Sequence, residues 1–221
     1  MREIVLDTET TGLNFNSGDR VIEIGCVEVV NRVRTGKFYH TYLNVPKESS
    51  PGALQVHGLT TEFLSDKPKF VDIVDEFLEF LGPDPLVIHN AKFDMGFLNN
   101  ELELHEKSIL DNPVVDSLIV ARKKFPGAQN NLDALCKRFN IDSSKRVKHG
   151  ALLDAELLAD VYLELTGGSQ ITFDLQNQEK QQAQNIQKVD FASRDYELSA
   201  EEKSAHDEML KKIKDSLWET N

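Results

Sequence analysis

A short apolar segment in the middle of the chain, residues 85–90 (PLVIHN), limits the possible folds more than any other feature. It follows a helical repeat of apolar residues over 70–81 that ends at Gly82-Pro83, and another helical pattern starts near Lys92. A strand that is apolar throughout and lies between helices is typical of a parallel strand buried on both faces of a sheet. The sequence therefore predicts an α/β fold with helices on both faces of its sheet.

The rest of the first 166 residues fits this arrangement. β-rich runs at 3–10, 21–30 and 37–43, the last two separated by a polar turn at 31–36, predict an antiparallel three-strand unit. Short helical pieces are expected at 53–58 and 60–64, a short strand at Val114-Val115, and helices at 92–104, 117–125, 131–139 and 151–166. Together these segments predict a mixed sheet with an antiparallel three-strand unit plus parallel strands.

The composition changes after Gly167-Gly168. Residues 170–187 contain seven glutamines and two asparagines, which predicts a flexible linker over 167–189. A capping box at 199–202 (SAEE) then opens a helix that is expected to run through about Trp218. We predict a core domain over 1–166 and a tail over 190–221 whose helix docks on another protein; the alternative is a helix that folds back on the core domain.

Whole-chain properties are those of a soluble globular protein of 221 residues. The N-terminus has no signal-peptide pattern, and no segment approaches the ~18 uninterrupted apolar residues that span a bilayer, so we expect a cytoplasmic protein without membrane contact. Cys26 and Cys136 lie in apolar patterns and are predicted core residues, not disulfide or zinc ligands. The net charge of -12 should repel nucleic acid, apart from basic runs at 122–124 and 145–148.

Four acidic residues stand at the ends of predicted elements. Asp7 and Glu9 are two apart in the first strand and therefore share one of its faces. Asp94 follows the 85–90 strand at the start of the next helix, and Asp154 lies at the head of the last core helix. Ligands of α/β folds bind at the carboxyl ends of strands, so these acids could converge. Like-charged pairs about 4 Å apart cost about 4 kcal/mol each at an effective dielectric of 20, which calls for cations.

Carboxylate oxygens are hard ligands that suit Mg²⁺ or Mn²⁺, and four of them nearly neutralise two divalent cations. Two such ions form a clamp for phosphodiester hydrolysis. His149 is five residues before Asp154, so it cannot share a helical face with it and should lie in the preceding loop, where it could act as general base. Singly, an Asp-x-Glu pair, a helix-start Asp94 or a loop histidine has an ordinary structural explanation. Their joint occurrence supports the prediction.

The same residues lie in the blocks LDTETTG, VIHNAKFD and HGALLDAELLADVY. As a set, these blocks resemble the DEDDh 3′ to 5′ exonucleases of the ribonuclease H-like fold. More narrowly, the chain resembles the proofreading epsilon subunits of bacterial DNA polymerase III, also in QVHGLTTEFLSDKP, DSLIVARKKFPG, NLDALCKRFNID and the tail DFASRDYELSAEEKSAHDEML. The resemblance implies hydrolysis of nucleotides from single-stranded or frayed DNA 3′ ends.

The resemblance also implies roles for single residues. Asp7, Glu9 and Asp154 would surround a first metal ion, Asp7 would be shared with a second, Asp94 would reach the second largely through water, and His149 would be the base. The residues expected to bind the terminal nucleotide are Asp7, Glu9, Thr10, Gly12, Leu13, Val56, His57 and Asp154.

Partner-binding segments are implied in the same way. Residues 170–175 (QITFDL) resemble a sliding-clamp peptide anchored by Gln170, Phe173 and Leu175, the alternative being a chance match in a Gln-rich linker. The tail resembles the segment that binds the DNA polymerase III alpha subunit, here through Met209, Ile213, Leu217 and Trp218. A theta subunit occurs in only some bacteria, and the sequence leaves its presence open.

Two other functions compete with DNA proofreading. An RNA-trimming exonuclease of the same fold would use the same chemistry, because the metal ions act on the phosphate and largely ignore the sugar. Such an enzyme has no need of a linker and a docking helix. A catalytically inactive polymerase accessory protein is the other alternative, and the intact set of acids with His149 argues against it.

Overall fold

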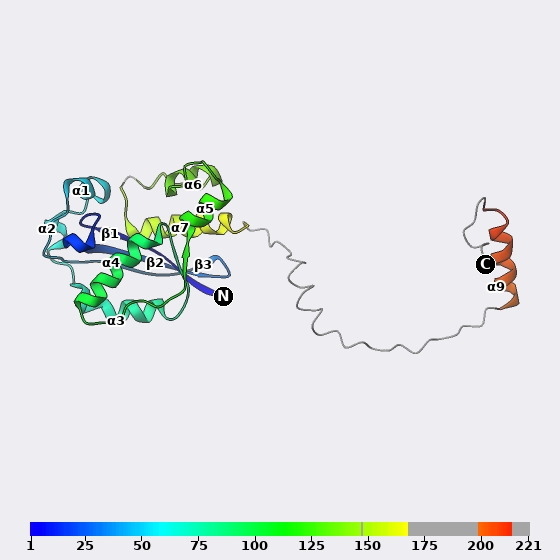
Figure 1. Ribbon diagram of the computed structural model, residues 1–221, viewed down its shortest axis with the longest axis horizontal. Coiled ribbons are helices and arrows are strands. Elements are labelled where there is room, and N and C mark those ends of the chain that lie inside the picture. The colour runs from blue at the N-terminus through cyan, green and yellow to red at the C-terminus, as the bar shows by residue number, and fades with distance from the viewer. Residues whose placement is uncertain (147, 168–198, 214–221) are drawn as a thin grey trace. The chain divides into compact units, whose positions relative to one another are not determined.

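The computed structural model describes residues 1–146, 148–167 and 199–213 (Figure 1). The chain divides into two compact units, residues 1–172 and 173–221. The predicted linker over 167–189 lies almost wholly outside the described residues, so this part of the predicted domain organisation stays a prediction. Within the described ranges, no helix has the length and apolar content that crossing a membrane would require.

The first unit contains a five-stranded mixed sheet in the order β3-β2-β1-β4-β5. β1 (Arg2–Thr10) pairs antiparallel with β2 (Val21–Val30), and β2 pairs antiparallel with β3 (Val33–Tyr42). β4 (Leu86–Ile88) lies parallel to β1, and β5 (Val114–Asp116) lies parallel to β4. The predicted fold class, an antiparallel three-strand unit extended by parallel strands, is confirmed.

The turn between β2 and β3 is shorter than the predicted segment 31–36. Asn31 and Arg32 both have positive φ angles, 51° and 67°, as the central residues of a tight two-residue hairpin require. The prediction was wrong because Gly36, with a φ of 87°, lies within β3. The pairing register between β2 and β3 shifts in this region, so the glycine serves an irregularity of the strand and not the turn.

Helices cover the sheet at the predicted places, with ends within two residues of those expected. They are α1 (Pro51–His57), α2 (Thr61–Leu64), α3 (Phe70–Leu81), α4 (Ala91–Leu104), α5 (Ser117–Lys124), α6 (Leu132–Phe139) and α7 (Ala151–Leu165). A short 3-10 helix, η1 (Phe15–Ser17), was not predicted.

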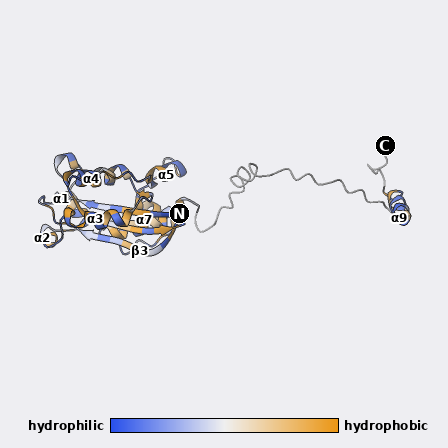
Figure 2. Ribbon diagram, turned by 90° about the horizontal axis from the view of Figure 1, so that it is seen from below, coloured by the Kyte–Doolittle hydropathy of each residue, from blue (hydrophilic) through white to orange (hydrophobic). Residues whose placement is uncertain are grey.

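Side chains of β1 alternate between two cores. Ile4 and Leu6 belong to a core shared with α3 and α4, whereas Val5 belongs to a second core built with α5, α6 and α7. Figure 2 shows the apolar residues of this unit concentrated along the strands. Cys26 and Cys136 are buried and unpaired, as predicted. Because Asp7 and Glu9 continue the odd-numbered series of Val5, they lie on the side of the sheet that α7 covers.

The second unit contains α9 (Ala200–Leu210) among its described residues. The predicted capping box is present, since the Ser199 side chain accepts from the backbone of Glu202 and the Glu202 side chain accepts from that of Ser199. The helix was predicted to run through about Trp218, and an unbroken helix of that length was wrong, because α9 ends at Leu210; residues 214–221 lie outside the described residues. The N–H groups of Lys212 and Ile213 donate to carbonyls three residues back, at 3.0 and 3.1 Å, which tightens and ends the last turn.

Candidate active site

Asp7 and Glu9 lie beside the start of α7 because one residue of β2 has no side chain. Gly25 is the register partner of Asp7. A Cβ atom at this position would lie 2.3 Å from the backbone carbon of Ala151 and 2.3 Å from the backbone nitrogen of Leu152. Only glycine allows such an approach, so the first turn of α7 packs directly on the sheet next to the two carboxylates.

The first turn of α7 supplies Asp154, and the loop before it supplies His149. Asp154 is only 3% exposed. His149 precedes the N-cap residue Gly150, which is the loop position expected from its spacing, and its backbone N–H donates to the Val56 carbonyl at 3.2 Å. Ligand atoms of Glu9, His149 and Asp154 all lie within 4.8 Å of one another. Side chains from β1, from the loop before α7 and from α7 itself therefore form a cluster that can hold a divalent cation.

Asp94 reaches the site from α4, on the opposite side of β1. The helix starts at Asn90, whose φ of 69° is left-handed, and the Asp116 side chain holds this start by accepting from the backbone N–H groups of Asn90 and Ala91. One oxygen of Asp94 accepts from the backbone N–H of Thr8 at 3.1 Å and from its hydroxyl at 2.7 Å. These bonds fix a buried carboxylate against the strand that carries Asp7 and Glu9.

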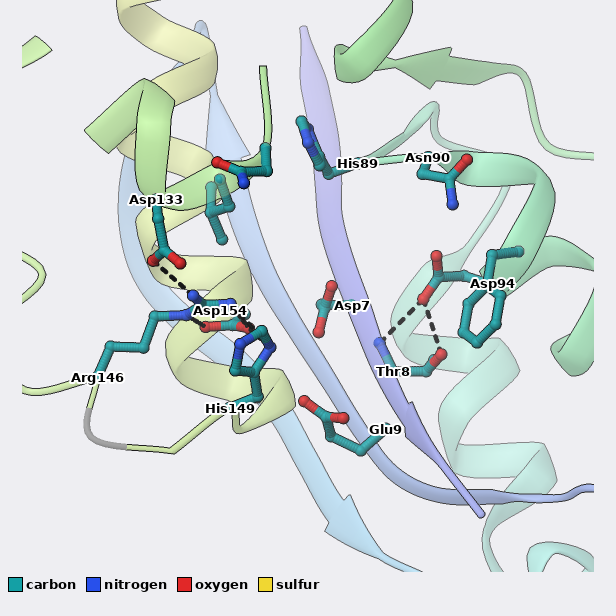
Figure 3. Close-up of a pocket in the computed structure, with 13 residues that line it drawn as sticks. Asp7, Thr8, Glu9, His89, Asn90, Asp94, Asp133, Arg146, His149 and Asp154 are labelled. Atoms are coloured by element: carbon teal, nitrogen blue, oxygen red, sulfur yellow. Dashed lines mark hydrogen bonds and ion pairs between the residues drawn. The ribbon is translucent and has the colours of Figure 1, made fainter. Parts of the chain in front are cut away.

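All five predicted catalytic residues line one pocket of about 460 Å³ (Figure 3). The other residues that line it were not identified from the sequence: Thr8, His89, Asn90, Phe93, Asn131, Leu132, Asp133 and Arg146. Of these, the family block VIHNAKFD contains His89, Asn90 and Phe93, so their positions inside a recognised motif could have indicated them.

Burial and mutual repulsion oppose ionisation of the carboxyl groups in this pocket. The pKa of Asp7 is raised well above its usual value by burial and by the charges of Asp94, Asp154 and Glu9. Burial, with the charges of Asp154 and Glu23, raises the pKa of Glu9 to about 8, and burial raises that of Asp94 to about 7 although bonds from Thr8 oppose the rise. A divalent cation bound to these carboxyl oxygens would offset their mutual repulsion and favour their ionised form.

Arg146 belongs to the basic run at 145–148 that was predicted to offset the repulsion of nucleic acid, yet its side chain is only 7% exposed. Its Nε and Nη2 atoms bind the two oxygens of Asp154 at 2.5 and 2.6 Å. Burial and the nearby Arg146 charge lower the pKa of His149, which favours the neutral imidazole.

The remaining residues predicted to bind the terminal nucleotide do not line this pocket: Thr10, Gly12, Leu13, Val56 and His57. The Thr10 hydroxyl donates to the Gly12 carbonyl at 2.6 Å, and Leu13 is 86% exposed. His57 is buried, and its Nε2 atom has no hydrogen-bond partner among the described residues. The backbone bond between His149 and Val56 places α1 next to the pocket, but the nucleotide-binding role of these five residues stays a prediction.

Of the predicted partner-binding residues, the structure describes only Met209 and Ile213, which are 52% and 49% exposed. Gln170, Phe173, Leu175, Leu217 and Trp218 lie outside the described residues.

Comparison with known proteins decides the family. Residues 4–162 match the family model described as exonuclease. The DNA polymerase III subunit epsilon of Salmonella typhimurium is 47% identical in an alignment of 235 positions, which covers 98% of this chain and 97% of the relative. That of Escherichia coli K12 is 50% identical over 190 residues, 82% of this chain and 78% of the relative. The chain belongs to the DNA polymerase III epsilon subunit family of exonucleases. The resemblance found in the motifs is thereby confirmed, and the chain is an exonuclease.

Solved structures of more distant exonucleases share the fold. Exonuclease X in complex with 5′ overhanging duplex DNA superposes with a TM-score of 0.60 at 23% identity, over 74% of this chain and 90% of that one. The nuclease domain of 3′hExo, a DEDDh family member bound to rAMP, superposes with a TM-score of 0.65 at 16% identity, over 75% of this chain and 91% of that one. The sheet and its helical layers are thus those of DEDDh exonucleases.

Proposed function

We propose that this exonuclease removes nucleotides from DNA 3′ ends by two-metal phosphodiester hydrolysis, as the proofreading subunit of a bacterial replicative polymerase. One observation supports this more than any other: Asp7, Glu9, Asp94, Asp154 and His149 come from three separate segments and line a single pocket. Relatives that match 97% and 78% of their length are named DNA polymerase III subunit epsilon.

The four carboxylates fit two divalent cations, Mg²⁺ or Mn²⁺. Asp7, Glu9 and Asp154 would hold the first, and Asp7 together with Asp94 would hold the second. Such cations activate water and stabilise the leaving oxygen of a phosphodiester. The pocket side chains are held on β1, α4 and α7, so the ligands are positioned by rigid elements before any substrate arrives.

His149 is the proposed general base. Its pKa is lowered by burial and by Arg146, so the imidazole is neutral near pH 7 and able to accept a proton from the attacking water. Its side chain is 43% exposed, whereas Asp154 is nearly enclosed, so the base faces the side from which substrate enters. Both Thr8 bonds go to one oxygen of Asp94, which fixes this carboxylate beside β1 at the pocket.

Substrate selection would depend on the state of the 3′ end and not on its sequence. A frayed, mispaired end enters a narrow pocket at a lower unstacking cost than a paired end. With a net charge of -12, the chain should bind free DNA weakly, so the polymerase would bring the DNA to it. We further propose that residues 190–221 bind the alpha subunit and that 170–175 bind the sliding clamp, with a theta subunit as an optional third partner.

Nucleotide release from a 3′-labelled oligonucleotide tests the chemistry. Asp7→Ala should abolish release from single-stranded DNA without lowering the thermal midpoint in EDTA, because its removal relieves repulsion among buried acids. Asp75→Asn, at an exposed position that pairs with Lys107, is the matched control and should retain full activity. Unchanged release by Asp7→Ala would refute the assignment.

A matched RNA oligonucleotide separates proofreading from RNA trimming. We expect faster release from DNA, and a preference for RNA would support the second function. Deletion of residues 190–221 should leave hydrolysis of free single-stranded DNA intact and end co-purification with the polymerase. Continued co-purification would show that the tail does not bind it.

A further inference from the structure

Arg146 lies between Asp133 and Asp154 in the lining of the acidic pocket, and the proposed hydrolysis gives it no role. Its guanidinium binds both oxygens of Asp154 and also one oxygen of Asp133, through Nη1 at 2.6 Å. The Nη2 atom lies 2.9 Å from Nδ1 of His149. In Figure 3 the side chain extends from its loop between these three groups. A buried guanidinium therefore uses nearly all of its donors on residues of the site.

Arg146 also differs in charge from the acidic residues that surround it. Among the described residues that line the pocket there are five carboxyl groups, and Arg146 is the one lysine or arginine. The bidentate bond engages both oxygens of Asp154, one of the proposed metal ligands. Arg146 thus supplies in the metal-free protein part of the positive charge that a divalent cation would supply in the active one.

We propose that Arg146 is an internal counter-ion that a divalent cation must displace from Asp154, and that it thereby sets the metal affinity of the exonuclease. The inference rests on the proposed metal-binding role of Asp154. The guanidinium fork bonds both oxygens of Asp154 and brings its positive charge to the carboxylate face that a chelating cation would use. Repulsion between the two positive charges would then drive the side chain away from Asp154 when the metal binds. The outward neighbour Asp133, whose side chain is 64% exposed, is the anchor that remains available to it.

Displacement of Arg146 has a second consequence for His149. A guanidinium has no acceptor, so in the observed contact the Nδ1 lone pair of His149 accepts a hydrogen bond from Arg146. When Arg146 leaves, that lone pair becomes free. Metal loading and release of the proposed base would therefore be coupled through one side chain.

Metal titration of the full-length protein without DNA tests the proposal. Calorimetric binding of Mn²⁺ should be about tenfold to hundredfold tighter for Arg146→Met than for the parent, since charge-assisted pairs of this kind have to be broken before the metal binds. Asp133→Asn, which removes the anchor for the displaced guanidinium, should instead weaken Mn²⁺ binding severalfold. Arg34→Met is the matched control: Arg34 pairs with Glu156 and Asp160 on α7 at 3.7 and 3.6 Å, away from the pocket, and its loss should leave the affinity unchanged.

Thermal unfolding supplies a readout that does not depend on catalysis. In EDTA, Arg146→Met should unfold at a lower temperature than the parent, and the increase produced by Mn²⁺ should be larger. Equal or weaker Mn²⁺ binding by Arg146→Met would overturn the proposal, because a structural ion pair that persists in the metal-bound state predicts that outcome. If Arg146→Met fails to fold, Arg146→Lys decides, because an ammonium cannot form the two-bond fork with Asp154: tighter Mn²⁺ binding than the parent supports the proposal, and equal or weaker binding overturns it. Absence of Mn²⁺ binding by the parent would instead refute the metal site, and this inference with it.

Discussion

Replacement of Glu9 by glutamine should stabilise the metal-free protein, and more strongly at pH 8 than at pH 5. Glu9 is 8% exposed, and its pKa is raised from 4.5 to about 8. A carboxyl with a raised pKa in the folded state causes no loss of stability below pH 4.5. Its cost grows as the pH rises and is complete above pH 8. With 1.36 kcal/mol per pKa unit, the cost is about 1 kcal/mol at pH 5 and about 4 kcal/mol at pH 8. Glutamine cannot ionise, so Glu9→Gln removes this cost.

Urea unfolding in EDTA at both pH values measures the effect. In thermal unfolding, the increase in midpoint that Glu9→Gln produces should be about 10 °C larger at pH 8 than at pH 5 for a chain of this size. Glu103→Gln, at an exposed position on α4, is the control and should change stability little at either pH. With saturating Mn²⁺ the order should reverse, because the parent binds the cation and the variant lacks a ligand. If Glu9→Gln gains no more stability at pH 8 than at pH 5, burial and the neighbouring charges do not raise the pKa of Glu9 as the structure implies.

Two further predictions concern the elements that position the site. Gly25→Ala should push α7 off the sheet, cost about 1 to 3 kcal/mol or more in unfolding free energy, and lower nucleotide release. Gly52→Ala is the control and should change little, because a Cβ at that position meets no atom within 4 Å. Equal stability of the two variants would contradict the close-packing argument. Arg20→Met should cost about 3 to 5 kcal/mol in urea unfolding, because it leaves the fully buried Glu101 without its bidentate partner. Arg34→Met, which breaks only exposed pairs, should cost at most about 1 kcal/mol, and similar costs for both arginines would refute the burial argument.

Much of the fold is predictable from local patterns. The helices of the first unit start and end within two residues of the predicted positions, because apolar periodicity, caps and Gly-Pro stops all act over a few neighbouring residues. The β2–β3 turn shows where this fails. Gly36 looks like a turn residue in the sequence, but the tight turn uses Asn31 and Arg32. The pairing register of the two strands decides which residues with positive φ form the hairpin turn. That register cannot be derived from composition.

The meeting of the four acids in one pocket was predictable because each belongs to a regular element whose geometry fixes its direction. Asp7 and Glu9 share a strand face, and Asp94 and Asp154 lie in first turns of helices. Arg146 lies in a loop, where no periodicity relates a position to a direction. In the sequence it is one member of a basic run, and only the tertiary contacts with Asp154 and Asp133 show that it turns inward.

The acids of the site lie on both sides of β1. The helical layer on one side holds Asp94, and the layer on the other side holds Asp154. Neither layer alone contains all of the proposed metal ligands. A small slip of α4 or α7 against the sheet would separate the acids while both cores and the strand ladder stayed intact. Exonuclease activity should therefore be lost at a lower temperature than secondary structure during heating. Hydrolysis would then report the loss of native packing in this protein more sensitively than circular dichroism does.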